Sequence, residues 1–400
     1  MDNRLIRALG VTAIASGAIL AARAVWANQS RIAFGRPLNE WTFSHMDRIM
    51  PTAPVPRGGA VRPLRPSSTP MPRTYEVDGA RRGLDELHRR TNTTSMVVLH
   101  RGELTHETYP GRFANPDRRM QLFSVSKSVT SILTGIAIEE GLLSLSDRVR
   151  DRCWWLVGSA FSDVTLEQLL DMSSGVGDLE DWNDPNSLLM RFDAAASGSG
   201  DIREVARVAE RTRPAGTAFN YSTVDTQVIG WMLESASGMS LAEYASARLL
   251  ARIGAERDGY YFLTRKAPRA AIAGGSLNLT SRDLARIGHM MSTNGRVGAD
   301  QIVDPAWVER GRTSEYSYLQ LGELGMSGYP EFGYANQWWT LGGPTRAFCA
   351  IGVHGQYLFV DPEREVVIAK TSAWSAADDL VRNHETVRAF ESIAAQLAGG

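Results

Sequence analysis

The sequence has little cysteine, and this excludes two classes of protein. Among its 400 residues are two cysteines, Cys153 and Cys349, too few for a disulfide scaffold or a cysteine-rich zinc site. The seven histidines do not show the HExxH spacing of a zinc-dependent hydrolase. The sequence also contains no Walker loop and no dinucleotide fingerprint. We therefore expect neither a metal nor a cofactor.

Basic residues are not in excess either. Lys and Arg total 43 against 44 for Asp and Glu, a formal net charge of -1. Proteins that bind nucleic acid usually carry a basic excess or stripe, so we expect no nucleic-acid partner. With 43% hydrophobic and 22% charged residues, the chain has the composition of a globular protein. Its length admits two or three domains, or one enzyme core with an inserted lobe.

Lysine is scarce. Only Lys127, Lys266 and Lys370 are lysine, and the other 40 basic residues are arginine. Arginine stays protonated and cannot act as a base, whereas a lysine with a lowered pKa can. Each lysine is therefore a candidate for a task that arginine cannot perform.

The N-terminal segment has the pattern of an export signal. Two arginines precede an apolar run over residues 8–22, which is shorter than the ~20 residues of a membrane span. Val25-Trp26-Ala27 fits a cleavage site, although Arg23 interrupts the approach to it, so an uncleaved anchor fits nearly as well. Residues 1–28 are thus predicted as a signal peptide or a membrane anchor, and the protein as exported (periplasmic or extracytoplasmic) or membrane-anchored. A buried first helix of a cytoplasmic protein is the alternative.

The remaining chain divides by composition. Residues 29–74 are rich in Pro, Arg and Ser, which predicts an extended surface arm or linker. Folded sequence is expected to start near Tyr75, with a hydrolase domain over residues 75–400. We divide this domain into a sheet subdomain, residues 75–149 and 256–400, and a mainly helical lobe, residues 150–255.

Hydrophobic periodicity places strands at both ends of this domain and helices between them. This order predicts an α+β fold, in which one antiparallel sheet built from both ends is flanked by helices and carries the inserted lobe. The expected helices cover residues 80–90, 124–140, 284–291 and 378–397, and the expected strands cover residues 95–100, 103–109, 348–360 and 365–371.

The central motif is Ser124-Val125-Ser126-Lys127. Positions i and i+3 share a helix face, so the hydroxyl of Ser124 and the amine of Lys127 can meet. A desolvated lysine with a lowered pKa can take the proton of an attacking serine, and a helix N-terminus offers free N–H groups to a developing oxyanion. The alternative is a surface lysine on an ordinary helix.

Several segments together resemble the serine β-lactamase/penicillin-binding-protein superfamily. Residues 123–128 (FSVSKS) and 138–147 (IEEGLLSLSD) resemble its active-site helix, and residues 169–175 (LLDMSSG) resemble its LLxxTSG segment. Residues 274–276 (GGS) and 281–286 (SRDLAR) resemble its GG and ARDLAR elements. The resemblance runs from about residue 80 to the end and implies a β-lactamase/transpeptidase-like fold.

The second catalytic element of this superfamily is Tyr-x-Asn or Tyr-x-Ser. The sequence Phe219-Asn220-Tyr221-Ser222-Thr223 occupies the matching place. The resemblance therefore implies that Tyr221 relays a proton between Ser124 and the leaving group. Thr223 stands where a β-lactamase or transpeptidase has Asn, which argues against those two activities.

The third element is normally Lys-Thr-Gly on a strand beside the nucleophile. Lys370-Thr371-Ser372 matches two of these letters, but it lies on the second strand of the terminal hairpin, and we interpret Lys370 as a strand-end surface lysine. The preceding strand, residues 348–357, resembles the esterase and aminohexanoate-oligomer (nylon-oligomer) hydrolase branch, with Ala350-Ile351-Gly352 in place of Lys-Thr-Gly. The backbone N–H of Val353 would then join that of Ser124 as the oxyanion hole; the alternative register uses Gln356.

The missing cationic lysine removes the usual anchor for a substrate carboxylate and favours neutral acyl groups. Residues 336–339 (NQWW) resemble the nylon-oligomer branch, in which a tryptophan closes over the substrate. Trp339 is therefore either a wall of the pocket or a core tryptophan. His354 is placed either in the pocket or as support for its strand. Asp178, with Glu180 and Asp181 in the same loop, is a candidate for a substrate amine, but this loop lacks the tyrosine of the branch's amidase.

The predicted function is that of a serine hydrolase that cleaves small-molecule esters or linear amides. The acyl-enzyme forms on Ser124, with Lys127 as the base and Tyr221 as the proton relay. One alternative is a β-lactamase or D-Ala-D-Ala carboxypeptidase. The other is a non-catalytic, membrane-anchored binding protein of the same fold, with membrane association through residues 8–22. Natural substrate and oligomeric state are left open.

Overall fold

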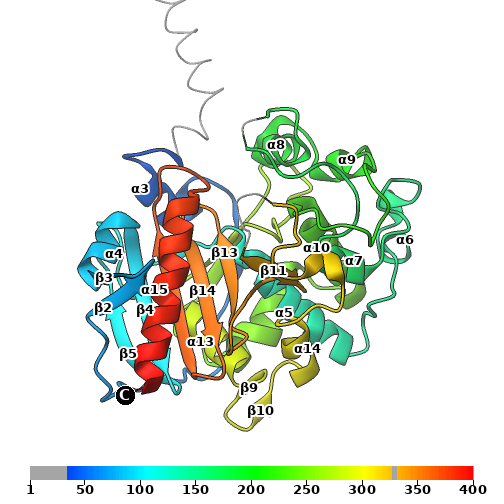
Figure 1. Ribbon diagram of the computed structural model, residues 1–400. Coiled ribbons are helices and arrows are strands. Elements are labelled where there is room, and N and C mark those ends of the chain that lie inside the picture. The colour runs from blue at the N-terminus through cyan, green and yellow to red at the C-terminus, as the bar shows by residue number, and fades with distance from the viewer. Residues whose placement is uncertain (1–33, 183, 327–330, 400) are drawn as a thin grey trace, which may run out of the picture.

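A seven-stranded antiparallel sheet forms the centre of the protein (Figure 1). The computed structural model describes residues 34–182, 184–326 and 331–399. The strand order is β11-β12-β13-β14-β15-β4-β5, so β15 from the C-terminal part pairs with β4 from the N-terminal part. This confirms the predicted sheet built from both ends. The strands are β4 (Thr93–His100), β5 (Glu103–Thr108), β11 (Phe332–Ala335), β12 (Trp338–Leu341), β13 (Phe348–Gly352), β14 (Gln356–Asp361) and β15 (Val366–Ser372).

Helices cover both faces of this sheet. Along β4, Val97 and Leu99 enter one hydrophobic core with α13 (Ser281–Ser292), while Met96 and Val98 enter a second core with α15 (Leu380–Gly399). The alternation follows from the two-residue repeat of a strand. Because both faces are covered, every residue of β4 is buried, including the polar residues at its two ends.

The helical lobe lies beside the sheet (Figure 1). A second, four-stranded sheet has the strand order β1-β7-β8-β6. The lobe contains α6 (Val149–Arg152), α7 (Leu166–Leu170), α8 (Leu188–Ala194), α9 (Ile202–Arg207), α10 (Thr223–Ser237), α11 (Leu241–Ala245) and α12 (Ala251–Ile253). The smaller elements are α3 (Asn39–Ser44), α4 (Leu84–Arg90), α14 (Pro305–Arg310), β1 (Thr52–Val55), β2 (Thr74–Val77), β3 (Ala80–Gly83), β6 (Met120–Gln121), β7 (Gly259–Phe262), β8 (Leu277–Leu279), β9 (Arg296–Val297) and β10 (Asp300–Gln301).

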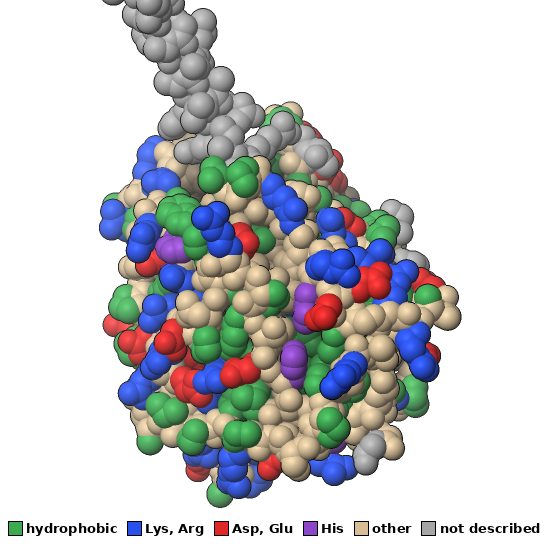
Figure 2. All heavy atoms as spheres, turned by 90° about the vertical axis from the view of Figure 1, so that its left-hand side faces the viewer, with side chains coloured by type: hydrophobic (Ala, Val, Ile, Leu, Met, Phe, Trp, Pro, Cys, Tyr) green, Lys and Arg blue, Asp and Glu red, His purple; other side chains and the backbone are tan. Residues whose placement is uncertain are grey.

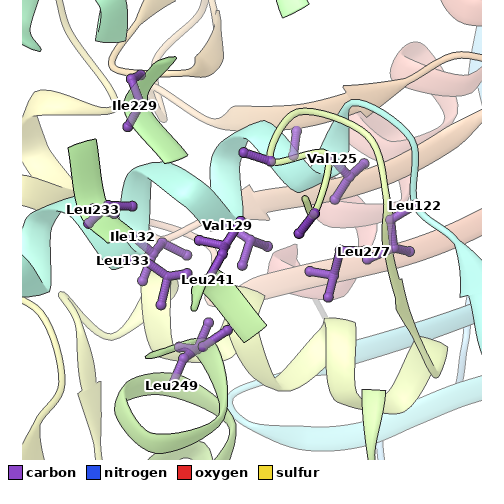
Figure 3. Close-up of a cluster of buried hydrophobic side chains, with 14 of the residues drawn as sticks. Leu122, Val125, Val129, Ile132, Leu133, Ile229, Leu233, Leu241, Leu249 and Leu277 are labelled. Carbon is purple, nitrogen blue, oxygen red and sulfur yellow. The ribbon is translucent and has the colours of Figure 1, made fainter. Parts of the chain in front are cut away.

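Helix α5 (Val125–Glu139) joins the two halves. Its apolar side chains pack against α10 and β8 (Figure 3). The helix ends where the sequence predicts, since Gly141 adopts a left-handed φ of 71°. Residues 125–137 are all buried, so the start of α5 is fixed by packing along nearly its whole length.

Two predicted elements differ from the structure. Residues 80–83 form strand β3, paired with β2 across a turn at Asp78-Gly79, and the helix begins only at Leu84. The single strand predicted over residues 348–360 is two strands, β13 and β14, because His354 and Gly355 adopt φ angles of 61° and 87° and reverse the chain. The turn signal is short, His354-Gly355-Gln356, with apolar segments on both sides.

The arm also contributes to the folded core. Helix α3 buries Phe43, and β1 pairs with β7, so folded sequence begins well before Tyr75. The amide of Asn39 donates hydrogen bonds to the carbonyls of Ala373 and Trp374, both at 3.0 Å. The predicted signal or anchor, residues 1–28, lies outside the described residues. Within the part of the chain that the structure describes, no helix is long and apolar enough to cross a membrane.

Charges on the outer face are balanced. Figure 2 shows acidic and basic side chains interspersed on the face that carries β2, β3 and α4. Glu385 of α15 is the buried exception: it accepts hydrogen bonds from Tyr75, Arg82 and Arg90. This ion-paired carboxylate joins α15 to the β2–β3 hairpin and to α4.

Lys370 is buried, contrary to the surface position that the sequence suggested. Its side chain has no exposed area and lies over the rings of Tyr357 and Trp374. Its amine donates to the hydroxyl of Ser372 at 2.6 Å. Burial lowers the pKa of Lys370 from 10.5 to about 7.

We expect Lys370→Met to stabilise the protein in a pH-dependent way. The folded pKa lies below the unfolded pKa, so the cost of burying this amine is complete below pH 7 and fades as the pH rises toward 10.5. Thermal melts should therefore show a larger gain in Tm for Lys370→Met over wild type at pH 6 than at pH 9.5. Lys266→Met, at an exposed position, is the control with no such dependence. An equal Tm change at both pH values would contradict a neutral buried lysine.

Candidate active site

The first turn of α5 brings a serine and a lysine together. Phe123 adopts a positive φ of 48°, an uncommon backbone for a non-glycine residue, and this bend places Ser124 at the N-cap of the helix. One turn later, the amine of Lys127 lies 3.0 Å from the Ser124 hydroxyl. The i, i+3 relation expected from the sequence is therefore present as a hydrogen bond.

The amine of Lys127 is buried and surrounded by oxygen acceptors. Besides Ser124 it donates to the Thr223 hydroxyl at 2.9 Å and to the Gly274 carbonyl at 3.1 Å. Burial lowers the pKa of Lys127 from 10.5 to about 8, against an opposing contribution from the carboxylate of Glu180. An amine with this pKa is partly neutral near pH 7 and can accept a proton.

Tyr221 completes the cluster. It lies just before α10, and its phenol is close enough to Ser124 to influence its own pKa. Its ring lies under the Lys127 amine, 4.9 Å from the ring centroid. Burial, followed by the charge of Glu180, raises the pKa of Tyr221 well above its usual value. The phenol therefore stays protonated and is suited to donate a proton rather than to take the first one.

Thr223 and Glu180 connect the lysine to the neighbouring loop. The Thr223 backbone N–H, at the N-terminus of α10, donates to the Glu180 carboxylate, while its side-chain hydroxyl accepts from Lys127. The sequence comparison treated Thr223 only as a departure from Tyr-x-Asn. In the structure it is a direct contact of the base, and the Glu180 carboxylate that its N–H contacts places a negative charge near both Lys127 and Tyr221.

Strand β13 passes directly beside the nucleophile. A Cβ added to Gly352 would lie 3.2 Å from the Ser124 amide nitrogen and 2.6 Å from the Leu122 carbonyl, so only glycine allows this approach. Val353 follows at the turn and lines both cavities next to Ser124. Lys370 lies two strands away on β15, which agrees with our rejection of it as the third-motif lysine.

Two cavities meet at Ser124. The larger, of about 380 Å³, is lined by Tyr221 and Trp339 and by residues of the β15–α15 loop. The second, of about 190 Å³, extends toward α3 and α8 and is lined mainly by apolar side chains. Trp182 borders both cavities. An extended molecule can therefore lie across the serine with one half in each cavity.

Trp339 is buried and forms part of the wall of the larger cavity. Its ring is stacked on Tyr221, with centroids 5.5 Å apart and an interplanar angle of 29°, and it lines the larger cavity. Phe219 and Tyr334 pack against the same two rings. This aromatic group forms an apolar wall beside the Ser124 hydroxyl and holds the phenol of Tyr221 in place.

Three residues that the sequence suggested for substrate binding, His354, Gln356 and Asp178, line neither cavity. His354 is buried among Phe34, Phe43 and Phe123 and bonds the Trp374 carbonyl; burial lowers its pKa to about 4. It supports the β13–β14 turn and lines neither cavity.

The other two corrections concern Gln356 and Asp178. Gln356 is fully buried, and its amide bonds the carbonyls of His354 and Ser372 within the turn. It does not line either cavity, so the oxyanion register based on it is not supported. Asp178 is exposed and also lines neither cavity, because the loop directs the neighbouring Glu180 inward instead.

The sequence analysis missed a carboxylate in the second cavity. Asp193, at the end of α8, lines this cavity together with Phe192 and Ile272. Desolvation raises its pKa, and no cation pairs with it among residues 34–182, 184–326 and 331–399. Its only signal in the sequence is an acid in the apolar stretch LLMRFDAAA. Within the same described ranges, no cluster of three or more His, Cys, Asp or Glu could hold a metal ion.

Comparison with known proteins agrees with this geometry. The sequence profile of the family described as Beta-lactamase matches residues 79–390. A 6-aminohexanoate-dimer hydrolase from Paenarthrobacter ureafaciens is 32% identical over 351 residues, which cover 86% of this chain and 87% of that protein.

Solved structures give the same fold. A putative 6-aminohexanoate-dimer hydrolase from Bacillus anthracis superposes with a TM-score of 0.81 at 25% identity, covering 92% of this chain and 96% of that one. A family VIII carboxylesterase superposes with a TM-score of 0.59 at 17% identity, covering 76% and 92% of the two chains. The predicted β-lactamase/transpeptidase-like fold is confirmed. The chain belongs to the beta-lactamase family and is a serine hydrolase.

Proposed function

We propose that this enzyme hydrolyses small linear amides or esters through an acyl-enzyme on Ser124. The observation that carries the proposal is the buried Lys127 amine, 3.0 Å from the Ser124 hydroxyl and beside a phenol that stays protonated. These three groups supply a nucleophile, a base and an acid at one point.

Acylation follows from the protonation states. Neutral Lys127 takes the proton of Ser124 as the Oγ–carbon bond forms. The N–H groups of Ser124 and Val353 donate to the oxyanion, where preorganised donors are worth most. Tyr221 then donates its proton to the departing amine or alcohol as the scissile bond breaks, and Lys127 returns a proton to the phenolate.

Deacylation repeats these steps with water in place of Ser124. Lys127 accepts the water's proton as its oxygen attacks the acyl carbon. Tyr221 donates its proton to the Ser124 Oγ when the ester bond breaks, and Lys127 then returns a proton to the phenolate. The product is a free carboxylic acid, and the cluster returns to its starting state.

The second cavity favours a substrate with an amine. The relative from Paenarthrobacter ureafaciens is named for a 6-aminohexanoate dimer, a linear amide with an amino group at one end. Asp193 lies in a mainly apolar cavity that Arg265 also lines, and it forms no ion pair within the described residues. A buried carboxylate is stabilised by a positive charge. We infer that Asp193 binds the ammonium group of an aminoacyl substrate.

The β-lactamase or D-Ala-D-Ala carboxypeptidase alternative has less support. Those substrates carry a carboxylate that a strand cation normally anchors. Here the strand beside Ser124 has Ala350-Ile351-Gly352, and Lys370, two strands away, lines neither cavity next to Ser124.

Ser124→Ala should abolish turnover. We expect kcat/KM for a p-nitrophenyl ester to fall by at least about 10³-fold, because the covalent intermediate cannot form. Intact mass after treatment with a fluorophosphonate should show one adduct on wild type and none on Ser124→Ala. A folded wild-type enzyme without an adduct would refute the proposed function, and a penicillin adduct with slow ester turnover would favour the β-lactamase alternative.

Glu180→Gln should move the acid limb of the pH profile. The Glu180 charge raises the pKa of Lys127, so its removal lowers that pKa, and neutral amine then persists to lower pH. We therefore expect the acid limb of kcat/KM to shift toward lower pH. Asp178→Asn, an exposed acid two residues away, is the matched control and should leave the limb in place. A limb that moves equally in both variants would rule out a specific effect on Lys127.

Asp193→Asn should affect amine-bearing substrates selectively. Loss of a charge pair worth ~1.4 kcal/mol would raise KM for a 6-aminohexanoyl amide about tenfold. The N-acetylated form of the same substrate should be unaffected, which separates loss of recognition from loss of structure. Equal KM changes for both substrates would argue against an ammonium site at Asp193.

A further inference from the structure

We propose that the rim of the larger cavity is a membrane-docking surface that sits on a zwitterionic lipid bilayer. The cavity would then open toward the bilayer and admit acyl substrates that partition into it. The substrate part of this inference rests on the proposed function; the docking part does not. The rim is made of Leu38, Leu179, Trp182, Leu380 and Val381.

These five side chains are unusually exposed for their type. Across the residues that the structure describes, eleven large hydrophobic side chains are exposed, and the rim holds five of them. Val381 is 72% exposed, Leu380 47% and Trp182 38%. An apolar group of this kind around one opening marks an interaction surface.

Three of the five residues line the larger cavity, and the other two are close in sequence to residues that line it or bond to its wall. Leu179, Trp182 and Leu380 line the larger cavity, and Val381 follows on the first turn of α15. Leu38 precedes Asn39, whose side chain bonds the carbonyl of Trp374, another residue of the cavity wall. In Figure 1, α3, the first turn of α15 and the region of α8 lie at the same end of the molecule.

The chain enters the structure at this same end. Phe34, the first described residue, lines the second cavity and contacts the rings of Phe43 and Phe123. The apolar run over residues 8–22 ends twelve residues earlier in the sequence, and twelve residues reach at most ~40 Å. A bilayer that holds residues 8–22 is therefore within this distance of the rim.

The charge of the rim selects the type of lipid surface. The loop that carries Leu179 and Trp182 has exposed acidic residues at 178, 181 and 184 and no basic residue. Anionic lipids attract basic segments, so an acidic loop disfavours them. Shallow insertion of apolar side chains is the remaining attraction. Because a few partly exposed side chains bind weakly, we assign affinity to the N-terminal tether and orientation to the rim.

The test compares two substrates on the full chain bound to phosphatidylcholine vesicles. One is p-nitrophenyl acetate, which stays in water, and the other is a p-nitrophenyl ester of a long-chain fatty acid, which partitions into the vesicles. The variant is Leu38→Ser/Val381→Ser, because neither residue lines a cavity. Val157→Ser, also exposed but on the helical lobe, is the matched control.

We expect the double variant to lose at least about fivefold in activity on the vesicle ester and nothing on the acetate. Flotation should show wild type and both variants on the vesicles, which confirms the tether. Equal activity of the double variant and Val157→Ser on the vesicle ester would overturn docking by the rim, as would a chain that does not float with vesicles. A dimer of the full chain in detergent that the double variant abolishes would assign the rim to a second copy and also overturn the proposal. Lack of activity on the acetate in wild type would instead count against the proposed function.

Discussion

The active site depends on one electrostatic constraint, the removal of the Lys127 amine from water. A lysine in solvent is protonated at neutral pH and cannot act as a base. Here burial lowers its pKa to about 8, and the oxygens of Ser124, Thr223 and Gly274 receive its hydrogen bonds. Those acceptors keep the amine from being an unsatisfied polar group, while none of them is a charged partner that would restore the usual pKa.

The rest of the fold provides this environment. Ser124 and Lys127 come from α5, Thr223 from the start of α10, and Gly274 from the segment before β8. Gln337, in the turn between β11 and β12, ties these parts together: its side chain bonds Thr226 of α10 and the carbonyl of Leu170 of α7, and its carbonyl accepts from Ser128 of α5. Apolar side chains of α5 pack against Ile229 and Leu233 of α10 (Figure 3).

The sequence predicted features that depend on residues close together in the chain, and it did not predict features that depend on tertiary packing. The serine–lysine pair and the end of α5 at Gly141 follow from helix periodicity and glycine conformation, and both are found. The β13–β14 turn was missed because tertiary packing, rather than a polar loop, stabilises positive φ at His354. Lys370 was misplaced because the rings of Tyr357 and Trp374 cover it, and the strand pattern of residues 365–371 does not show what covers a face of the strand. Asp193 was not recognised because its significance comes from a cavity that several segments enclose.

The order of strands in the central sheet has a consequence for biosynthesis. More than half of the chain separates Ser124 from the turn at Val353, and β4 finds its neighbour β15 only near the C-terminus. A nascent polypeptide emerging from the ribosome therefore has the nucleophile long before it has the strand that lies beside it. Such non-local pairing slows folding. Hydrolytic competence therefore requires residues from the last part of the chain to be synthesised and the sheet to close.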